Sequence, residues 1–137
     1  MEFIDKITKI SNVTIDAVIE NQWIWEESKS AAEGTNVTLW WVLGLGSGEK
    51  FSRATIVFIQ TGTVVQNNVA VILQSGVRQI DAKYQSRADI TREGQNVSLT
   101  LTNVTLSDDG AYRCRVETST DAFGKDRTTV LEVTGKT

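Results

Sequence analysis

The sequence predicts an all-β fold, a sandwich of two packed sheets. In residues 96–101 three aliphatic side chains alternate with Ser and Thr, which is the period-2 pattern of a strand with one buried face. In residues 112–116 Tyr, Cys and Val alternate with Arg in the same way, and the segment between these strands is rich in Asp and Gly, as turns are. Further short apolar runs at 36–43 and 54–60 favour additional strands.

The N-terminal part is the least regular stretch of the sequence. Isoleucines within 4–10 have partial helical spacing, whereas apolar residues within 13–19 alternate as in a strand. We therefore interpret residues 1–20 as an N-terminal extension, either a leader or an added strand. Residues 21–137 are then the folded domain, which begins with a strand at 22–25.

The strand predicted at 36–43 has one apolar face, which consists of Val37, Leu39, Trp41 and Leu43. Trp40 points to the opposite face and needs a cover, either from residues 1–20 or from a partner. The glycine-rich segment 44–48 is similar to a phosphate cradle, but no helix follows it, so we interpret it as a flexible loop.

The remaining strands follow in order. Residues 54–60 form a strand, and the run 69–73 forms the next one. Residues 84–88 lead into a further strand, which comes before the strand that begins at residue 96. The last strand is predicted at 128–133, after a loop that contains Gly124.

The composition excludes several classes of function. Apolar residues make up 40% and charged residues 23% of the chain, as in ordinary globular proteins. The net charge is −3 and there is no basic run, which argues against binding to nucleic acid or to an anionic membrane. No apolar run is long enough for a membrane span. Charges at Glu2, Asp5 and Lys6 argue against a signal peptide, so an extracellular protein would be represented here by a trimmed piece.

One cysteine and no histidine leave little room for catalysis. A Ser-His-Asp or Cys-His pair cannot be assembled, and no histidine is available as a metal ligand or base. We therefore expect no enzymatic activity, no catalytic or metal site, and no cofactor. A lone cysteine also cannot form an internal disulfide, which taken alone would favour the cytosol.

The order Asp108-x-Gly110-x-Tyr112-x-Cys114 resembles the corner between strands E and F of immunoglobulin V-type domains. The resemblance implies that the Tyr112 hydroxyl bonds back to the backbone just upstream and that Cys114 faces the core. It also implies an ion pair between Asp108 and Arg87, with a structural role.

Two positions depart from the family pattern. Trp41 stands where the first core cysteine of the family falls, and Phe58 stands where the core tryptophan falls. The fold expected is thus an immunoglobulin V-type β-sandwich without the B–F disulfide. Losing a bridge that closes about seventy residues forfeits about 4 kcal/mol, of which burial of Trp41 returns about 2–3 kcal/mol. We expect Cys114 to be a buried thiol beside Trp41.

The segments 33–41, 52–55 and 84–87, together with the corner, resemble the V-set-like domains of cnidarian immunoglobulin-superfamily receptors, including the hydroid allorecognition proteins. The resemblance covers about residues 22–134. It implies an extracellular N-terminal recognition domain of a cell-surface receptor in cell adhesion and immunity, with homophilic, allele-specific binding between cells. Two alternatives stay open: a heterophilic V-set adhesion or immune receptor, and an accessory immunoglobulin subunit of a membrane complex.

A partner-binding face is predicted on the sheet that contains residues 54–60. Strand 54–60 and strand 69–73 are apolar on both faces, whereas a sheet with one wet face should alternate. An outward apolar patch with a charged rim is typical of an interface, in this case with a second copy. The alternative is an apolar run that is over-packed, or that is covered by the chain's own segment between strand 69–73 and the strand that residues 84–88 enter. The predicted partner-binding residues are Val57, Ile59, Val69, Val71, Arg113, Arg115 and Val130.

Sequons for N-glycosylation favour an extracellular location. They begin at Asn12, Asn36, Asn96 and Asn103, and each reads Asn-Val-Thr or Asn-Val-Ser. None of them falls on the predicted partner-binding strands. We therefore expect the domain to lie on the extracellular face of the plasma membrane.

Overall fold

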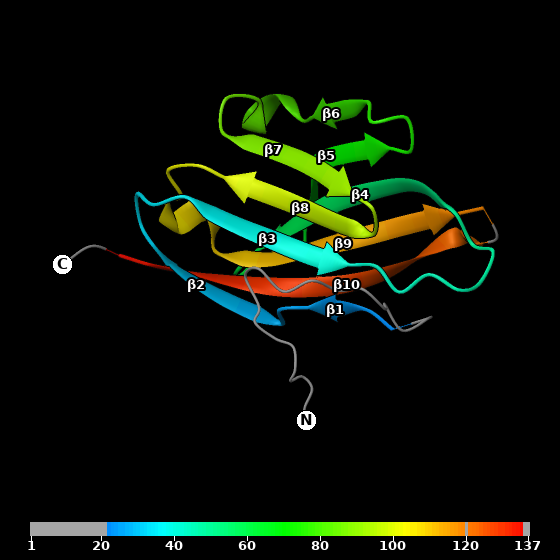
Figure 1. The fold of residues 1–137 in the computed structure, drawn as a ribbon. Helices are drawn as coiled ribbons and strands as arrows, with labels where there is room; N and C mark the ends of the chain where they lie inside the picture. Colours follow the sequence, from blue (N-terminus) through cyan, green and yellow to red (C-terminus); the bar gives the residue numbers. More distant parts are fainter. Residues whose placement is uncertain (1–21, 120, 136–137) are drawn as a thin grey trace.

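The computed structural model describes residues 22–119 and 121–135, which form two packed β-sheets (Figure 1). The first sheet has the strand order β1–β3–β8–β7, with bounds Ile24–Trp25, Val37–Val42, Asn96–Leu101 and Ala88–Glu93. The second has the order β2–β10–β9–β4–β5–β6, with bounds Ser28–Ala32, Asp121–Thr134, Gly110–Thr118, Phe51–Gln60, Gln66–Leu73 and Arg78–Ile80. Every strand pair is antiparallel except β2 with β10.

Two short 3-10 helices complete the fold. The helix η1 spans Ala82–Tyr84 before β7, and η2 spans Leu106–Asp108 before β9. The all-β sandwich is confirmed, and the predicted strands are present. The strands β4, β5, β9 and β10 extend beyond the predicted bounds, whereas β1 and β3 are shorter than predicted. The sequence did not predict β2 or β6, which are short edge strands with little apolar alternation. The strand proposed as one alternative for residues 1–20 lies outside the described residues.

The core lies between the two sheets. The apolar face predicted for β3 is confirmed, because Leu39, Trp41 and Leu43 are fully buried. From the opposite sheet, Phe58 and Tyr112 stack with ring centroids 4.5 Å apart and planes 25° from parallel. Aromatic packing from both sheets therefore fills the centre of the sandwich.

Cys114 is a free and fully buried thiol in this core, as predicted. Burial raises the pKa of the thiol, because the thiolate would lose its solvation. Trp41 is also fully buried, but its indole Nε1–H has no hydrogen-bond partner. An unpaired buried donor carries a desolvation cost of about 1–3 kcal/mol.

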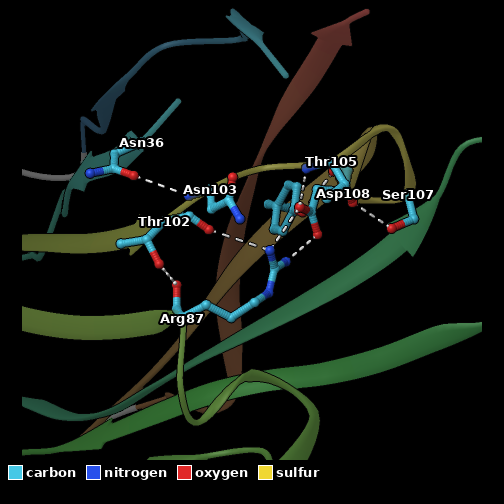
Figure 2. A network of polar contacts seen from close by, with 8 residues as sticks. Asn36, Arg87, Thr102, Asn103, Thr105, Ser107 and Asp108 are labelled. Carbon is cyan, nitrogen blue, oxygen red and sulfur yellow. Dashed lines mark hydrogen bonds and ion pairs between the residues drawn. The ribbon is translucent and has the colours of Figure 1, made fainter. Parts of the chain in front are cut away.

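The corner between β8 and β9 has the arrangement that its sequence predicts (Figure 2). The Tyr112 hydroxyl donates to the Asp108 carbonyl at 2.7 Å. Arg87 at the start of β7 donates through both terminal nitrogens to the Asp108 carboxylate, at 3.0 Å for Nη1. Gly110 follows, and a Cβ at this position would lie 2.3 Å from the Ile59 carbonyl oxygen, so only glycine fits. The corner thus ties β7, η2 and β9 together.

Candidate protein-binding face

The outer face of the six-stranded sheet is defined by the register of its central strands. Ile56 pairs with Cys114 and both point into the core, so their neighbours Val57 and Arg113 pair on the outer face. The same register places further residues on this face, namely Ile59, Val71, Arg115 and Val130.

The apolar side chains of this face form a cluster of Ile59 and Val130 on either side of Ala111, with Val71 apart from it. Ile59 and Val71 are half-buried, and Val130 is 47% exposed. Val57 faces outward but is only 8% exposed, and it does not belong to the main core cluster. The exposed apolar surface therefore comes from Ile59, Val71 and Val130 rather than from Val57.

Arg113 accounts for the low exposure of Val57. Its Nη2 donates to the Gln66 side-chain oxygen at 3.2 Å. Because β4 lies between β9 and β5, the Arg113 side chain has to cross the outer side of β4 to reach Gln66. Its Nε–H is buried without a partner. Part of the apolar patch is thus covered by the chain's own arginine, which comes from β9 and not from the segment after strand 69–73 that the alternative interpretation of the sequence proposed.

The prediction for Val69 is wrong. Val69 is fully buried and belongs to the core cluster. The β4–β5 register shifts at this point, since Ile56 pairs with Ala70 but Val57 pairs with Asn68. Val69 is the extra residue of this bulge, which breaks the alternation and turns its side chain inward.

Charged residues lie beside and between these apolar side chains. Arg53 and Glu117 form an ion pair of 2.6 Å at one end of the face. Glu132 accepts from the Ser30 hydroxyl at 3.3 Å near the other end, and Arg115 is exposed between them on the inner strand β9. A face with apolar side chains and charges of both signs is compatible with a protein–protein interface.

Sequence reasoning missed Glu49, which fixes one end of the sheet. Its side chain is 7% exposed and accepts from the Gly46 backbone N–H at 2.8 Å, the Thr118 hydroxyl at 2.7 Å and Lys125 Nζ at 3.1 Å. These donors lower the pKa of Glu49 to about 2, the Gly46 hydrogen bond having the largest effect. The loop after β3 is thereby joined to β9 and β10. The sequence carries no local signal for these contacts, which bridge distant segments.

The opposite outer face, on the four-stranded sheet, is mostly polar but also carries Trp40 and Ile24, of which Ile24 is 38% exposed. Trp40 pairs with Ser98 and is half-buried, while Thr38 and Thr100 share a hydrogen bond of 3.0 Å. Because its side chain is half-buried, Trp40 is less available to a partner than a fully exposed tryptophan would be. Residues 1–20, which the sequence offers as a cover for Trp40, lie outside the described residues.

The described sequon asparagines are all exposed and lie away from the six-stranded sheet. Asn36 precedes β3, Asn96 begins β8, and Asn103 follows β8 with the left-handed φ of 51°. Asn36 Oδ1 accepts from the Asn103 backbone N–H at 3.0 Å, so two sequons meet at the corner (Figure 2). Asn12 lies outside the described residues.

The described part of the chain offers neither a metal centre nor a membrane span. It holds no group of three or more His, Cys, Asp or Glu side chains that could bind a metal ion. It also has no helix of the length and apolarity that a membrane crossing requires. Two polar hollows, of about 390 and 180 Å³, lie beside Arg87.

Comparisons with known proteins agree with this architecture. The model of the immunoglobulin V-set domain matches residues 25–134. Among solved structures, the chain is similar to murine CRIg, with a TM-score of 0.67 and 17% sequence identity over 85% of this chain and 98% of that chain. At this identity the likeness shows the fold alone. No curated protein matches the sequence. The V-set match extends over most of the chain and over both sheets, and the chain therefore belongs to the immunoglobulin V-set family.

Proposed function

We propose that this V-set domain is the extracellular recognition domain of a cell-surface receptor, and that it binds a second copy of itself on an opposing cell. The observation that carries the proposal is the outer face of the six-stranded sheet, where Ile59 and Val130 form an apolar cluster on either side of Ala111, next to charges of both signs. Domains of this family are typically extracellular and bind proteins. Allele-specific recognition, as in the cnidarian receptors that the sequence resembles, is part of the proposal.

A second copy fits this face better than a partner of one charge. The face carries Arg115 and Arg113 as well as Glu117 and Glu132, so two identical faces related by a two-fold axis can place opposite charges against each other. A cofactor or small-molecule substrate has no place in the proposal. A different protein partner remains an outcome of the test.

The test is aggregation of beads coated with the domain. Ile59→Lys should abolish aggregation, because a lysine in the apolar cluster would lose its hydration at the interface without gaining a partner. This desolvation costs several kcal/mol at a packed interface. Lysine is chosen because an aspartate at this position could pair with nearby Arg113. The melting temperature should change little, since Ile59 is half-buried and a lysine can extend into solvent.

The matched control is Thr100→Lys on the opposite sheet. Thr100 pairs with Asp89 across the strands, so a lysine there is compatible with the fold and should leave aggregation intact. Normal aggregation of folded Ile59→Lys beads would refute the proposed face. If wild-type beads never aggregate with one another but bind other cells, the partner is a different protein. Mixing beads that carry sequence variants tests allele specificity.

A further inference from the structure

A polar hollow of about 390 Å³ lies beside the corner between β8 and β9. It is lined by Lys83, Tyr84, Arg87, Asn103, Thr105, Ser107 and Asp108. Arg87 and Asp108 bind each other, and the Thr105 and Ser107 hydroxyls are 2.7 Å apart (Figure 2). The hollow is thus a rigid, hydrogen-bonding surface at the end of the sandwich, on a different part of the molecule from the proposed partner-binding face.

The sequon Asn103-Val104-Thr105 contributes two residues to the lining of this hollow. The Asn103 backbone is fixed, because its N–H donates to Asn36 Oδ1 at 3.0 Å and its φ is 51°. The Asn103 side chain is exposed, so its amide is accessible for modification. A sugar attached there begins at the edge of the hollow. By contrast, neither Asn36 nor Asn96 lines either of the two cavities.

We propose that the hollow holds the first sugar of an N-linked glycan on Asn103 and that this contact stabilises the corner. N-acetylglucosamine has hydroxyl and acetamide groups, which match a surface of hydroxyls and charged groups such as Thr105, Ser107 and Lys83. Because the sugar is attached to the same chain, its effective concentration at the hollow is high and weak contacts are sufficient. The inference rests on the extracellular location in the proposed function, but not on homophilic binding.

The experiment uses a secreted form of the domain in which Asn103 is the only sequon. Thr14→Ala, Thr38→Ala and Ser98→Ala remove the other three sequons, and Asn36 keeps the side chain that accepts from Asn103. Peptide mass spectrometry should find the glycan on Asn103. The melting temperature is then compared between the full glycan, a glycan trimmed to one sugar, and the protein after complete enzymatic removal, which leaves aspartate. Aspartate tolerates the left-handed backbone, and protein made without glycosylation, which keeps Asn103, controls for the charge that the aspartate adds.

We expect the full and single-sugar forms to have the same melting temperature, and the sugar-free form to have a melting temperature about 4 °C lower. A shift of this size is what one or two hydrogen bonds give in a domain of this length. Lys83→Ala should leave the sugar-free form unchanged and reduce the difference between the forms. The matched control keeps only the Asn96 sequon, and there removal of the glycan should leave the melting temperature unchanged. An unmodified Asn103, or an equal shift in the Asn96 control, overturns the inference. Bead aggregation is measured separately, so the proposed function stands or falls on its own assay.

Discussion

Replacing Trp41 tests the packing that substitutes for the family's disulfide. Trp41 is fully buried between the sheets, and the resemblance of the sequence to the family places it where the first core cysteine falls. Trp41→Ala leaves a large cavity, and deletion of a buried aromatic costs about 3–5 kcal/mol. Because domains of this size have about 5–15 kcal/mol of stability in total, this variant is expected to be partly or wholly unfolded.

Trp41→Phe separates the packing of the ring from its polar group. The change removes roughly three ring atoms, which amounts to about 2 kcal/mol of transfer free energy. It also removes the Nε1–H that lies buried without a partner, a relief of about 1–3 kcal/mol. The two effects nearly cancel, so we expect the free energy of unfolding of Trp41→Phe to stay within about 1 kcal/mol of wild type.

The assay is urea unfolding followed by circular dichroism, with the free energy taken from linear extrapolation at unchanged slope. Trp40→Ala is the control, because Trp40 is half-buried on the outer face and its loss should cost much less than that of Trp41. Equal losses for Trp40→Ala and Trp41→Ala would contradict the facing of β3. A Trp41→Phe variant as unstable as Trp41→Ala would mean that the indole N–H has a partner.

Three further experiments test other parts of the structure. Arg87→Met should cost about 3–5 kcal/mol in urea unfolding, since it leaves the buried Asp108 carboxylate without its cation, whereas Arg78→Met at an exposed pair should cost under about 1 kcal/mol. Glu49→Gln should lower the melting temperature at neutral pH. Because the pKa of Glu49 is lowered from 4.5 to about 2, its carboxylate stabilises the fold fully above about pH 4.5 and less as the pH falls towards 2. The difference in melting temperature between Glu49→Gln and wild type should therefore shrink over this range. A difference that stays constant would show that the charge is not its source. Cys114 should react slowly with thiol reagents in the native protein and rapidly in denaturant, and fast native labelling would show that the thiol is accessible.

The sequence predicted those features that depend on local alternation or on one well-defined corner. The facing of Leu39 and Trp41 followed from a strand with one apolar side, and the bonds of Arg87 and Tyr112 to Asp108 followed from the resemblance of the corner. Such features are encoded within a few residues of each other or in a motif with fixed roles. They can therefore be predicted without knowledge of the tertiary structure.

The features that the sequence missed depend on long-range contacts. The bulge at Val69 interrupts the alternation of β5, and no residue type in that run marks the extra position. Arg113 covers Val57 because its side chain crosses a neighbouring strand to Gln66, forty-seven positions away in the sequence. Glu49 gains its role only when the loop after β3 meets Thr118. Apart from the two short edge strands β2 and β6, which were not predicted, the errors concern which side chain covers or turns away from another.

The two outer faces of the sandwich differ in a way that supports the choice of binding face. An N-linked glycan needs an asparagine that stays exposed to water, so an asparagine inside a packed interface cannot carry a glycan. The described sequons at Asn36, Asn96 and Asn103 all lie in or next to the four-stranded sheet, whose outer face also carries the Thr38–Thr100 hydrogen bond. The six-stranded sheet has none of them and instead exposes Ile59 and Val130. The four-stranded sheet also carries Trp40 and Ile24 on its outer face, so the difference between the two faces rests on the sequons. The sheet next to the sequons is suited to contact with solvent and glycan, and the sheet without them to contact with protein.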